Sequence, residues 1–256
     1  MRFFRSALFN LFFFVSTGVL ALYGLAALLL APRRVLRLPV QWARLELAAL
    51  RVLCGIRFTV LGGENLPHVP ALIASQHQST FDTIVWFLIL PHCSYVLKRE
   101  LTRTPLFGLL LRPAGMIVID RKAGAKAIRG LVRDVSAAMR ADRRVVIFPE
   151  GTRAEPGRPH PIQPGIAALA SVLECPILPV TTDSGRFWGR RAFHKRPGEI
   201  RIVIHPRLQA GLSRSAVLAH LDALYRAGPS VDNSVGEPTH LLQAESSRKR
   251  EDVDLP

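Results

Sequence analysis

The stretch VVIFPEGTR, residues 145–153, decides the fold that we expect for this chain. Its first four residues are β-branched or aromatic, which predicts a short buried strand. Pro149 and Gly151 then end the strand and bend the backbone. The polar side chains that follow are left at the strand's carboxyl end, where open α/β sheets usually hold their ligands. Arg153 suits a phosphate there, because its planar guanidinium donates two parallel hydrogen bonds.

Short β-rich runs alternate with helical patterns after Gly55. The predicted strands cover residues 57–61, 71–75, 95–97, 116–119, 145–148, 177–181 and 200–205. The predicted helices cover residues 80–90, 104–111, 123–140, 164–174 and 213–226, with Ser213 as a possible N-cap of the last. This alternation predicts an α/β domain over residues 56–227, in which helices flank a mostly parallel or mixed sheet.

The amino-terminal residues 1–55 are predicted to form a membrane-anchoring region of two helices. Residues 7–31 are almost continuously apolar, and a helix of that length spans roughly 37 Å, more than a hydrocarbon core of about 30 Å. The run ends at Pro32-Arg33-Arg34, which favours a retained anchor over a cleaved signal peptide. Arginines flank both ends, so the charge rule leaves the orientation open. One resolution is that the segment dips into one leaflet and both ends stay cytosolic.

A second helix is expected directly after this segment. Arg37, Arg44 and Arg51 are spaced by seven residues and therefore share one helix face. Apolar side chains fall roughly opposite, namely those of Trp42, Ala49, Leu50 and Leu53. The pattern is typical of a helix lying in a membrane interface, and it also fits an ordinary surface helix packed on the core.

The charge of the chain indicates a polyanionic partner. The 256 residues include 34 Lys and Arg but only 19 Asp and Glu, a formal net charge of +15. Basic residues beside apolar segments favour anionic membrane lipids, and no aromatic-rich basic stripe suggests nucleic acid. Residues 228–256 are polar and acidic, and we predict that they are disordered.

The three cysteines do not suggest a metal site. Cys54, Cys93 and Cys175 form no CxxC pair and no Cys/His spacing typical of zinc. Their sparse, odd number fits a reduced, cytosol-facing protein. No dinucleotide-binding fingerprint is present either, so we predict neither a metal nor a bound cofactor.

His77 and Asp82 follow the predicted strand 71–75. On a regular helix, five residues would place them roughly 140° apart, so they can pair only if His77 precedes the helix and Asp82 lies in its first turn. Asp82 would then fix the ring tautomer and leave the other nitrogen as a general base. Taken alone, the spacing is weak, and a hydrogen-bonded core histidine explains it better.

Three cations also follow predicted strands. Lys98, beside Arg99, comes after the run 95–97, Arg121 comes after the run 116–119, and Arg153 comes a few residues after the run 145–148. If these strands are neighbours, the three charges converge on one edge of the sheet. For any one of them alone, a solvated surface charge is the simpler interpretation.

Taken together, the blocks resemble those of the glycerolipid acyltransferases, most of all the bacterial members that acylate lysophosphatidate. The matching blocks are residues 76–82, 98–100, 115–121, 148–153 and 175–180, and the resemblance covers about residues 55–225. The FPEGTR block is highly specific. One residue departs from the pattern, since Gln76 stands where many members carry asparagine.

The resemblance implies transfer of an acyl chain from acyl-CoA or acyl carrier protein to the 2-hydroxyl of lysophosphatidate, giving phosphatidate for phospholipid biosynthesis. It implies that His77 is the base and that Asp82 orients it. It implies a substrate-binding set made of Glu150, Gly151, Thr152, Arg153, Arg121 and Lys98. Pro176 and Pro179 would line the path of the acyl chain.

Two alternatives to this activity stay open. The acceptor could be another lysolipid, such as lyso-ornithine lipid, or the chain could be a non-catalytic binder of anionic membrane lipids. In the enzyme interpretation we expect the protein at the inner (cytoplasmic) membrane, with the catalytic domain facing the cytoplasm.

Overall fold

The structure, a computed structural model, describes residues 1–173, 175–209 and 211–229, apart from the side chains of Lys122 and Ala125. Its centre is a sheet of seven strands. The strands are β1 (Ile56–Leu61), β2 (Leu72–Ser75), β3 (Ser94–Lys98), β4 (Ile117–Ile119), β5 (Val145–Ile147), β6 (Ile177–Thr182) and β7 (Gly198–Ile204). Most of the predicted tail, from residue 230 on, lies outside the described residues.

The sheet is mixed, as the sequence predicts. Its order is β1-β7-β6-β2-β5-β3-β4. Strands β6, β2, β5, β3 and β4 run parallel to one another, whereas β7 is antiparallel to β6 and carries β1 parallel to itself. The carboxyl ends of β2, β5, β3 and β4 therefore meet at one edge of the sheet, and the carboxyl ends of β7 and β1 lie at the opposite edge.

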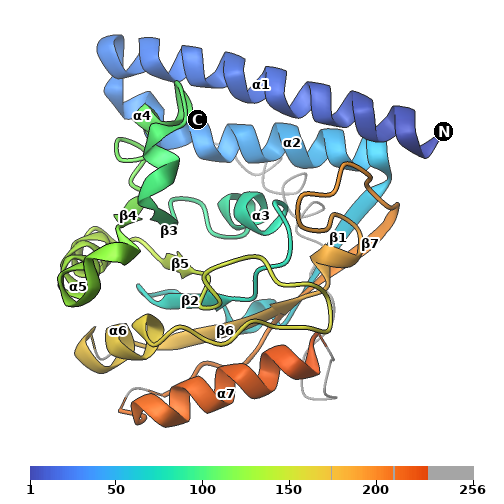
Figure 1. Ribbon diagram of the computed structural model, residues 1–256. Coiled ribbons are helices and arrows are strands. Elements are labelled where there is room, and N and C mark those ends of the chain that lie inside the picture. Colours follow the sequence, from blue (N-terminus) through green and yellow to red (C-terminus); the bar gives the residue numbers. More distant parts are fainter. Residues whose placement is uncertain (174, 210, 230–256) are drawn as a thin grey trace, which may run out of the picture.

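Helices cover both faces of the sheet (Figure 1). On one face lie α1 (Arg2–Leu30), α2 (Leu38–Cys54), α3 (Asp82–Ile89) and the short α4 (Phe107–Leu110). On the other lie α5 (Gly124–Arg140), α6 (Gly165–Leu173) and α7 (Arg214–Ala227). Side chains that alternate along each strand feed the two cores. In β2, for example, Ile73 packs toward α1–α3 and Leu72 toward α5–α7.

The starts of two helices, α7 and α4, show how the local sequence determines where a helix begins. The Ser213 Oγ accepts the amide of Ala216 at 3.2 Å, so the predicted N-cap of α7 is confirmed. The predicted helix 104–111 is wrong in its first half. Pro105 drives Thr104 into an extended conformation, so a 3-10 turn (η3, Arg99–Arg103) precedes α4 instead.

The first two helices are present and pack against each other. Polar residues that interrupt the apolar run of α1 face α2: the Ser16 hydroxyl donates to the Glu46 carboxylate at 2.5 Å, and the Trp42 indole donates to the Thr17 hydroxyl at 3.0 Å. Leu50 is buried against the sheet, so α2 packs on the core as an ordinary surface helix does.

The outer face of α1 is apolar and exposed. Among the described residues, α1 is the one helix long and apolar enough to cross a membrane. Phe4 is 76% exposed, Phe14 72% and Leu29 84%. Large apolar side chains so exposed usually mark an interaction surface. Embedding of α1 and α2 in a membrane remains a prediction.

Candidate active site

His77 lies in the loop between β2 and α3, and Asp82 is the first residue of α3. This placement is the arrangement that pairing of the two side chains needs. The His77 Nδ1 is 3.2 Å from the Asp82 Oδ2. The same oxygen accepts the backbone amides of Gln78 and Ser79, each at 2.7 Å. The loop thus folds around one carboxylate, which fixes the position of the imidazole.

The protonation state of His77 follows from these contacts. An ionised carboxylate can only accept, so Nδ1 carries the ring proton and Nε2 is left as an acceptor. Burial lowers the pKa of His77, the hydrogen bond and charge of Asp82 raise it, and the charges of Arg153 and Lys98 lower it again. The net shift is downward, so the ring is neutral at neutral pH. A neutral imidazole can take a proton from a substrate.

The ring of His77 is also held by an aromatic neighbour. It stacks on Phe148, with 4.1 Å between ring centroids and 19° between ring planes. Its side chain is 11% exposed, so only a small part of the ring can reach a substrate. Phe148 is the first residue of the FPEGTR block, so this block supports the His77 ring and also supplies charged residues beside it.

Glu150 supports the same loop from the end of β5. One carboxylate oxygen accepts the amide of His77 at 2.9 Å, and the other accepts the amide of His160 at 3.0 Å. The side chain is 2% exposed, and burial raises its pKa to about 7. Both oxygens are thus engaged by backbone. Its contact with a substrate remains a prediction, whereas its hold on His77 is visible.

Three cations gather at the same edge of the sheet. Lys98 ends β3, Arg121 follows β4, and Arg153 follows β5. The Arg121 Nη1 donates to the Gly151 carbonyl at 2.7 Å. The amide of Ala154 donates to the His77 carbonyl at 2.7 Å, which joins the loop after β5 to the loop between β2 and α3, residues 76–81. The strands are neighbours, so the convergence expected from the sequence is found.

Gly151 is required at its position. Its φ of +69° is unfavourable for other residues, and a Cβ there would lie 2.5 Å from the Arg121 Nη1. The glycine therefore lets Arg121 approach the backbone beside Arg153. Thr152, which lies between Gly151 and Arg153 in the sequence, is partly buried.

Two residues that were not predicted to belong to the site, Gln76 and Tyr225, hold the end of β2 and the loop that carries His77. The Gln76 side chain accepts the Thr182 amide at 3.2 Å and donates to the Tyr225 carbonyl at 3.1 Å. The Tyr225 hydroxyl donates to the Ala74 carbonyl at 2.9 Å. Helix α7 is thereby tied to β2 immediately before His77. The substitution at position 76 was the available signal, but Tyr225 lies outside every matching block.

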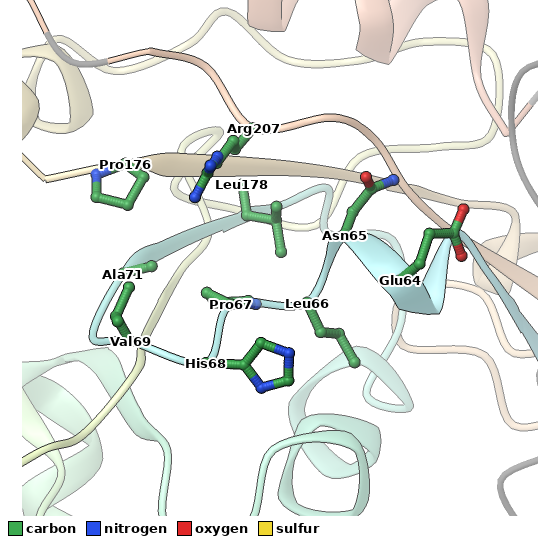
Figure 2. A pocket seen from close by; sticks show the side chains of 10 residues that line it. All are labelled: Glu64, Asn65, Leu66, Pro67, His68, Val69, Ala71, Pro176, Leu178 and Arg207. Carbon is green, nitrogen blue, oxygen red and sulfur yellow. The ribbon is translucent and has the colours of Figure 1, made fainter.

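The structure does not bring the two prolines next to His77. Pro176 precedes β6, at the end of the strand opposite the loop that carries His77, and the two ends of such a strand are roughly 15–20 Å apart. Pro176 lines a pocket of about 360 Å³ at that far edge, together with His68 and Arg207 (Figure 2). Pro179 pairs with Ala74 in mid-strand. The acyl path through these residues remains a prediction.

A metal site is not apparent in the part of the chain that the structure describes. There, no group of three or more His, Cys, Asp or Glu side chains is placed to hold an ion. The expectation that the protein works without a bound cofactor remains a prediction.

An imidazole–carboxylate pair beside clustered cations, at the carboxyl edge of a mixed α/β sheet, fits acyl transfer to a phosphorylated acceptor. The comparisons agree: the acyltransferase family matches residues 57–183. The chain is 34% identical, over 93% of its length and 93% of the relative's, to 1-acyl-sn-glycerol-3-phosphate acyltransferase of Pseudomonas aeruginosa. The protein therefore belongs to the acyltransferase family and is an acyltransferase.

Two further relatives extend the comparison. The human 1-acyl-sn-glycerol-3-phosphate acyltransferase alpha is 33% identical over 70% of this chain and 65% of its own. The crystal structure of the 1-acyl-sn-glycerophosphate acyltransferase from Thermotoga maritima superposes with a TM-score of 0.72, at 21% identity, over 89% of this chain and 95% of that one. At that identity the structure shows a shared fold.

Proposed function

We propose that this protein is a 1-acyl-sn-glycerol-3-phosphate acyltransferase, which acylates the 2-hydroxyl of lysophosphatidate to give phosphatidate. The observation that carries the proposal is the contact of His77 Nδ1 with Asp82 Oδ2 at 3.2 Å, near the charges of Lys98 and Arg153. Relatives of this name from a bacterium and from human support the choice of acceptor.

In the proposed reaction, the His77 Nε2 takes the proton of the acceptor hydroxyl as its oxygen attacks the thioester carbonyl carbon. The carbon–sulfur bond then breaks, and the leaving thiolate receives the proton from His77. Asp82 stabilises the imidazolium that exists between these steps. The thioester is already activated, so the reaction needs neither an acyl-enzyme nor a bound cofactor.

The cations hold the phosphate of the acceptor in this proposal. Arg153 and Lys98 lie close enough to His77 for their charges to act on its pKa, and Arg121 is joined to Gly151. A guanidinium and a phosphate form charge-assisted hydrogen bonds, which are roughly twice as strong as neutral ones. A phosphate held here would place a nearby hydroxyl of the same molecule at the base.

The membrane association follows from the same proposal, because one substrate and the product are lipids. The exposed apolar face of α1 would lie in the bilayer, and the catalytic domain would sit on the cytoplasmic side of the inner membrane. Anionic lipids would be its surroundings, and acyl-CoA or acyl carrier protein would deliver the acyl chain.

The test is an acyl-transfer assay with purified protein in vesicles, using a panel of lysolipid acceptors and both donors. We expect transfer to lysophosphatidate and its loss in His77→Ala. Preference for a phosphate-free acceptor such as lyso-ornithine lipid would contradict the choice of acceptor. If the wild type bound the lipid vesicles but transferred no acyl chain, the non-catalytic binder would be favoured.

A further inference from the structure

The loop between β6 and β7, residues 184–197, is a strongly cationic part of the described surface that the proposed reaction leaves unused. We call it the cationic loop. It contains no Asp or Glu. Its basic residues are Arg186, Arg190, Arg191, His194, Lys195 and Arg196. In Figure 1 it lies beside β1 and β7 and rises toward the layer formed by α1 and α2.

The four arginines of the cationic loop are exposed and uncompensated. Among the described residues, none of their side chains forms a hydrogen bond or an ion pair. Arginines elsewhere in the chain are often matched: Arg201 pairs with Asp183 at 3.2 Å, and Arg226 pairs with Asp222 at 2.7 Å. Like charges held together repel one another, so an anionic partner that balanced them would bind this loop favourably.

Lys195 fastens this loop to the first turns of α1. Its side chain is 3% exposed, and its Nζ donates to the Asn10 side chain and to the Phe193 carbonyl. The Nζ also lies over the rings of Phe9, at 5.4 Å, and Trp188, at 5.0 Å. The loop and the amino-terminal end of α1 are therefore held as one surface.

Exposed aromatic side chains lie directly beside the arginines. Phe193 is 43% exposed and Phe3 is 56% exposed, with 5.3 Å between their ring centroids. Phe4, 76% exposed, contacts Phe3 edge-on. Aromatic rings next to cations are typical of protein surfaces that sit at the headgroup level of a membrane.

The other end of the cationic loop contacts the loop between β2 and α3, which carries His77. The Gly185 amide donates to the Gln78 side chain at 3.2 Å, next to His77 in the sequence. Arg190 lies close enough to Arg153 for its positive charge to help lower the pKa of that guanidinium, after the larger effect of burial. The loop thus runs from the aromatic end of α1 to the proposed phosphate site.

We propose that the cationic loop, with Phe3 and Phe193 beside it, is the surface through which the catalytic domain binds the phosphate groups of an anionic bilayer. The partner is a lipid surface, because the arginines share one surface with exposed aromatic rings and with the apolar face of α1. An acidic soluble protein would match the charges but not these rings. The inference rests on the proposed function, since it assigns where the enzyme meets the membrane that holds its acceptor.

The test compares binding of the purified full chain to vesicles of phosphatidylcholine alone and of phosphatidylcholine with phosphatidylglycerol, by flotation. The variant replaces Arg190, Arg191 and Arg196 by Gln. We expect its extra affinity for anionic vesicles to fall roughly 100-fold, about 3 kcal/mol at about 1.4 kcal/mol per tenfold change. Its binding to pure phosphatidylcholine should be unchanged, since α1 is intact.

The control carries the same change of charge on the opposite layer, replacing Arg129, Arg140 and Arg214 by Gln. We expect the control to keep the preference for anionic vesicles. A third protein, with Lys in place of the three loop arginines, should also keep it. Equal losses in the loop variant and the control, or no loss in the loop variant, would overturn the proposal.

The binding assay separates this inference from the proposed reaction. His77→Ala should bind anionic vesicles as the wild type does, whatever its acyl-transfer activity. If the wild type bound both vesicle types equally, but bound an acidic protein through the loop arginines, the lipid partner would be wrong while the acyltransferase proposal stood.

Discussion

The two edges of the sheet carry similar residue types but different chemistry. At the edge where β2, β3, β4 and β5 end, His77 is paired with a carboxylate and lies among cations. At the opposite edge, His68 and Arg207 line a pocket of about 360 Å³ (Figure 2). His68 is exposed there, and no carboxylate among the described residues pairs with its ring, whereas His77 is buried. A histidine and an arginine become a candidate site through burial and pairing, which only one edge supplies.

The topology explains this difference. Parallel strands deliver the residues that follow them to one edge, so four separate chain segments meet around His77. Strand β7 runs antiparallel to β6, and β1 runs parallel to β7. The carboxyl ends of β7 and β1 therefore lie at the opposite edge of the sheet. The far pocket is therefore lined largely by one segment, residues 64–71, with few partners from elsewhere.

The difference between the two edges is tested most strongly by removing the His77 side chain, which should have the largest effect on acyl transfer. We expect His77→Ala to lower kcat roughly 1,000-fold, the usual contribution of a general base. His68→Ala, at the far edge, should leave kcat unchanged. The measurement is acyl transfer from a thioester to lysophosphatidate, and equal losses in the two variants would mean that the edges do not differ as described.

The cations give the next largest effect. Arg153→Gln should lower kcat/KM for lysophosphatidate by roughly 10- to 100-fold, because a hydrogen bond to a charged group contributes about 1.5–3 kcal/mol. The matched change at the far edge is Arg207→Gln, for which we expect no loss. A dephosphorylated acceptor should react almost equally with wild type and Arg153→Gln. A loss of the same size with that acceptor would show that Arg153 does not hold the phosphate.

The support from α7 should give a smaller effect. Tyr225→Phe removes the hydrogen bond to Ala74 and should lower the free energy of unfolding by about 1 kcal/mol. We expect kcat to fall several-fold with KM unchanged, because the change loosens β2 just before the loop that positions His77. Tyr23→Phe, on the exposed face of α1, is the control and should leave kcat and stability unchanged. If Tyr225→Phe lost stability but kept kcat, the tie to β2 would be purely structural.

The smallest effect concerns pH. The base must be neutral to act, so kcat/KM rises as pH rises through the pKa of His77 and is level above it. Because that pKa is lowered from its ordinary 6.5, the rise should be complete by neutral pH. Asp82 raises the pKa of His77, so Asp82→Asn should move the rise to still lower pH while reducing the plateau. A shift to higher pH in Asp82→Asn would contradict the pairing.

Much of this site could be predicted from the sequence because its residues follow strands. His77, Lys98, Arg121 and Arg153 each follow an apolar run, and they meet because the strands that carry them run parallel and are neighbours in the sheet. The pairing of His77 with Asp82 needed one further condition, that α3 begin at Asp82, and the structure meets it.

The supporting contacts could not be predicted in the same way. Tyr225 acts through a helix whose docking depends on the whole fold, and Glu150 engages amides whose positions the sequence does not reveal. Lys195 resembles any other surface lysine in the sequence, yet it is buried where the cationic loop packs against α1. Such contacts join residues 73 to 189 positions apart, where local patterns carry no information.

The most direct test of the account is the protonation of the His77 ring, measured by nitrogen NMR on the purified enzyme across a pH titration. We expect a proton on Nδ1, no proton on Nε2 at neutral pH, and a pKa of the His77 ring below 6.5. A proton on Nε2, or a pKa above 6.5, would contradict the claim that His77 is a neutral base held by Asp82.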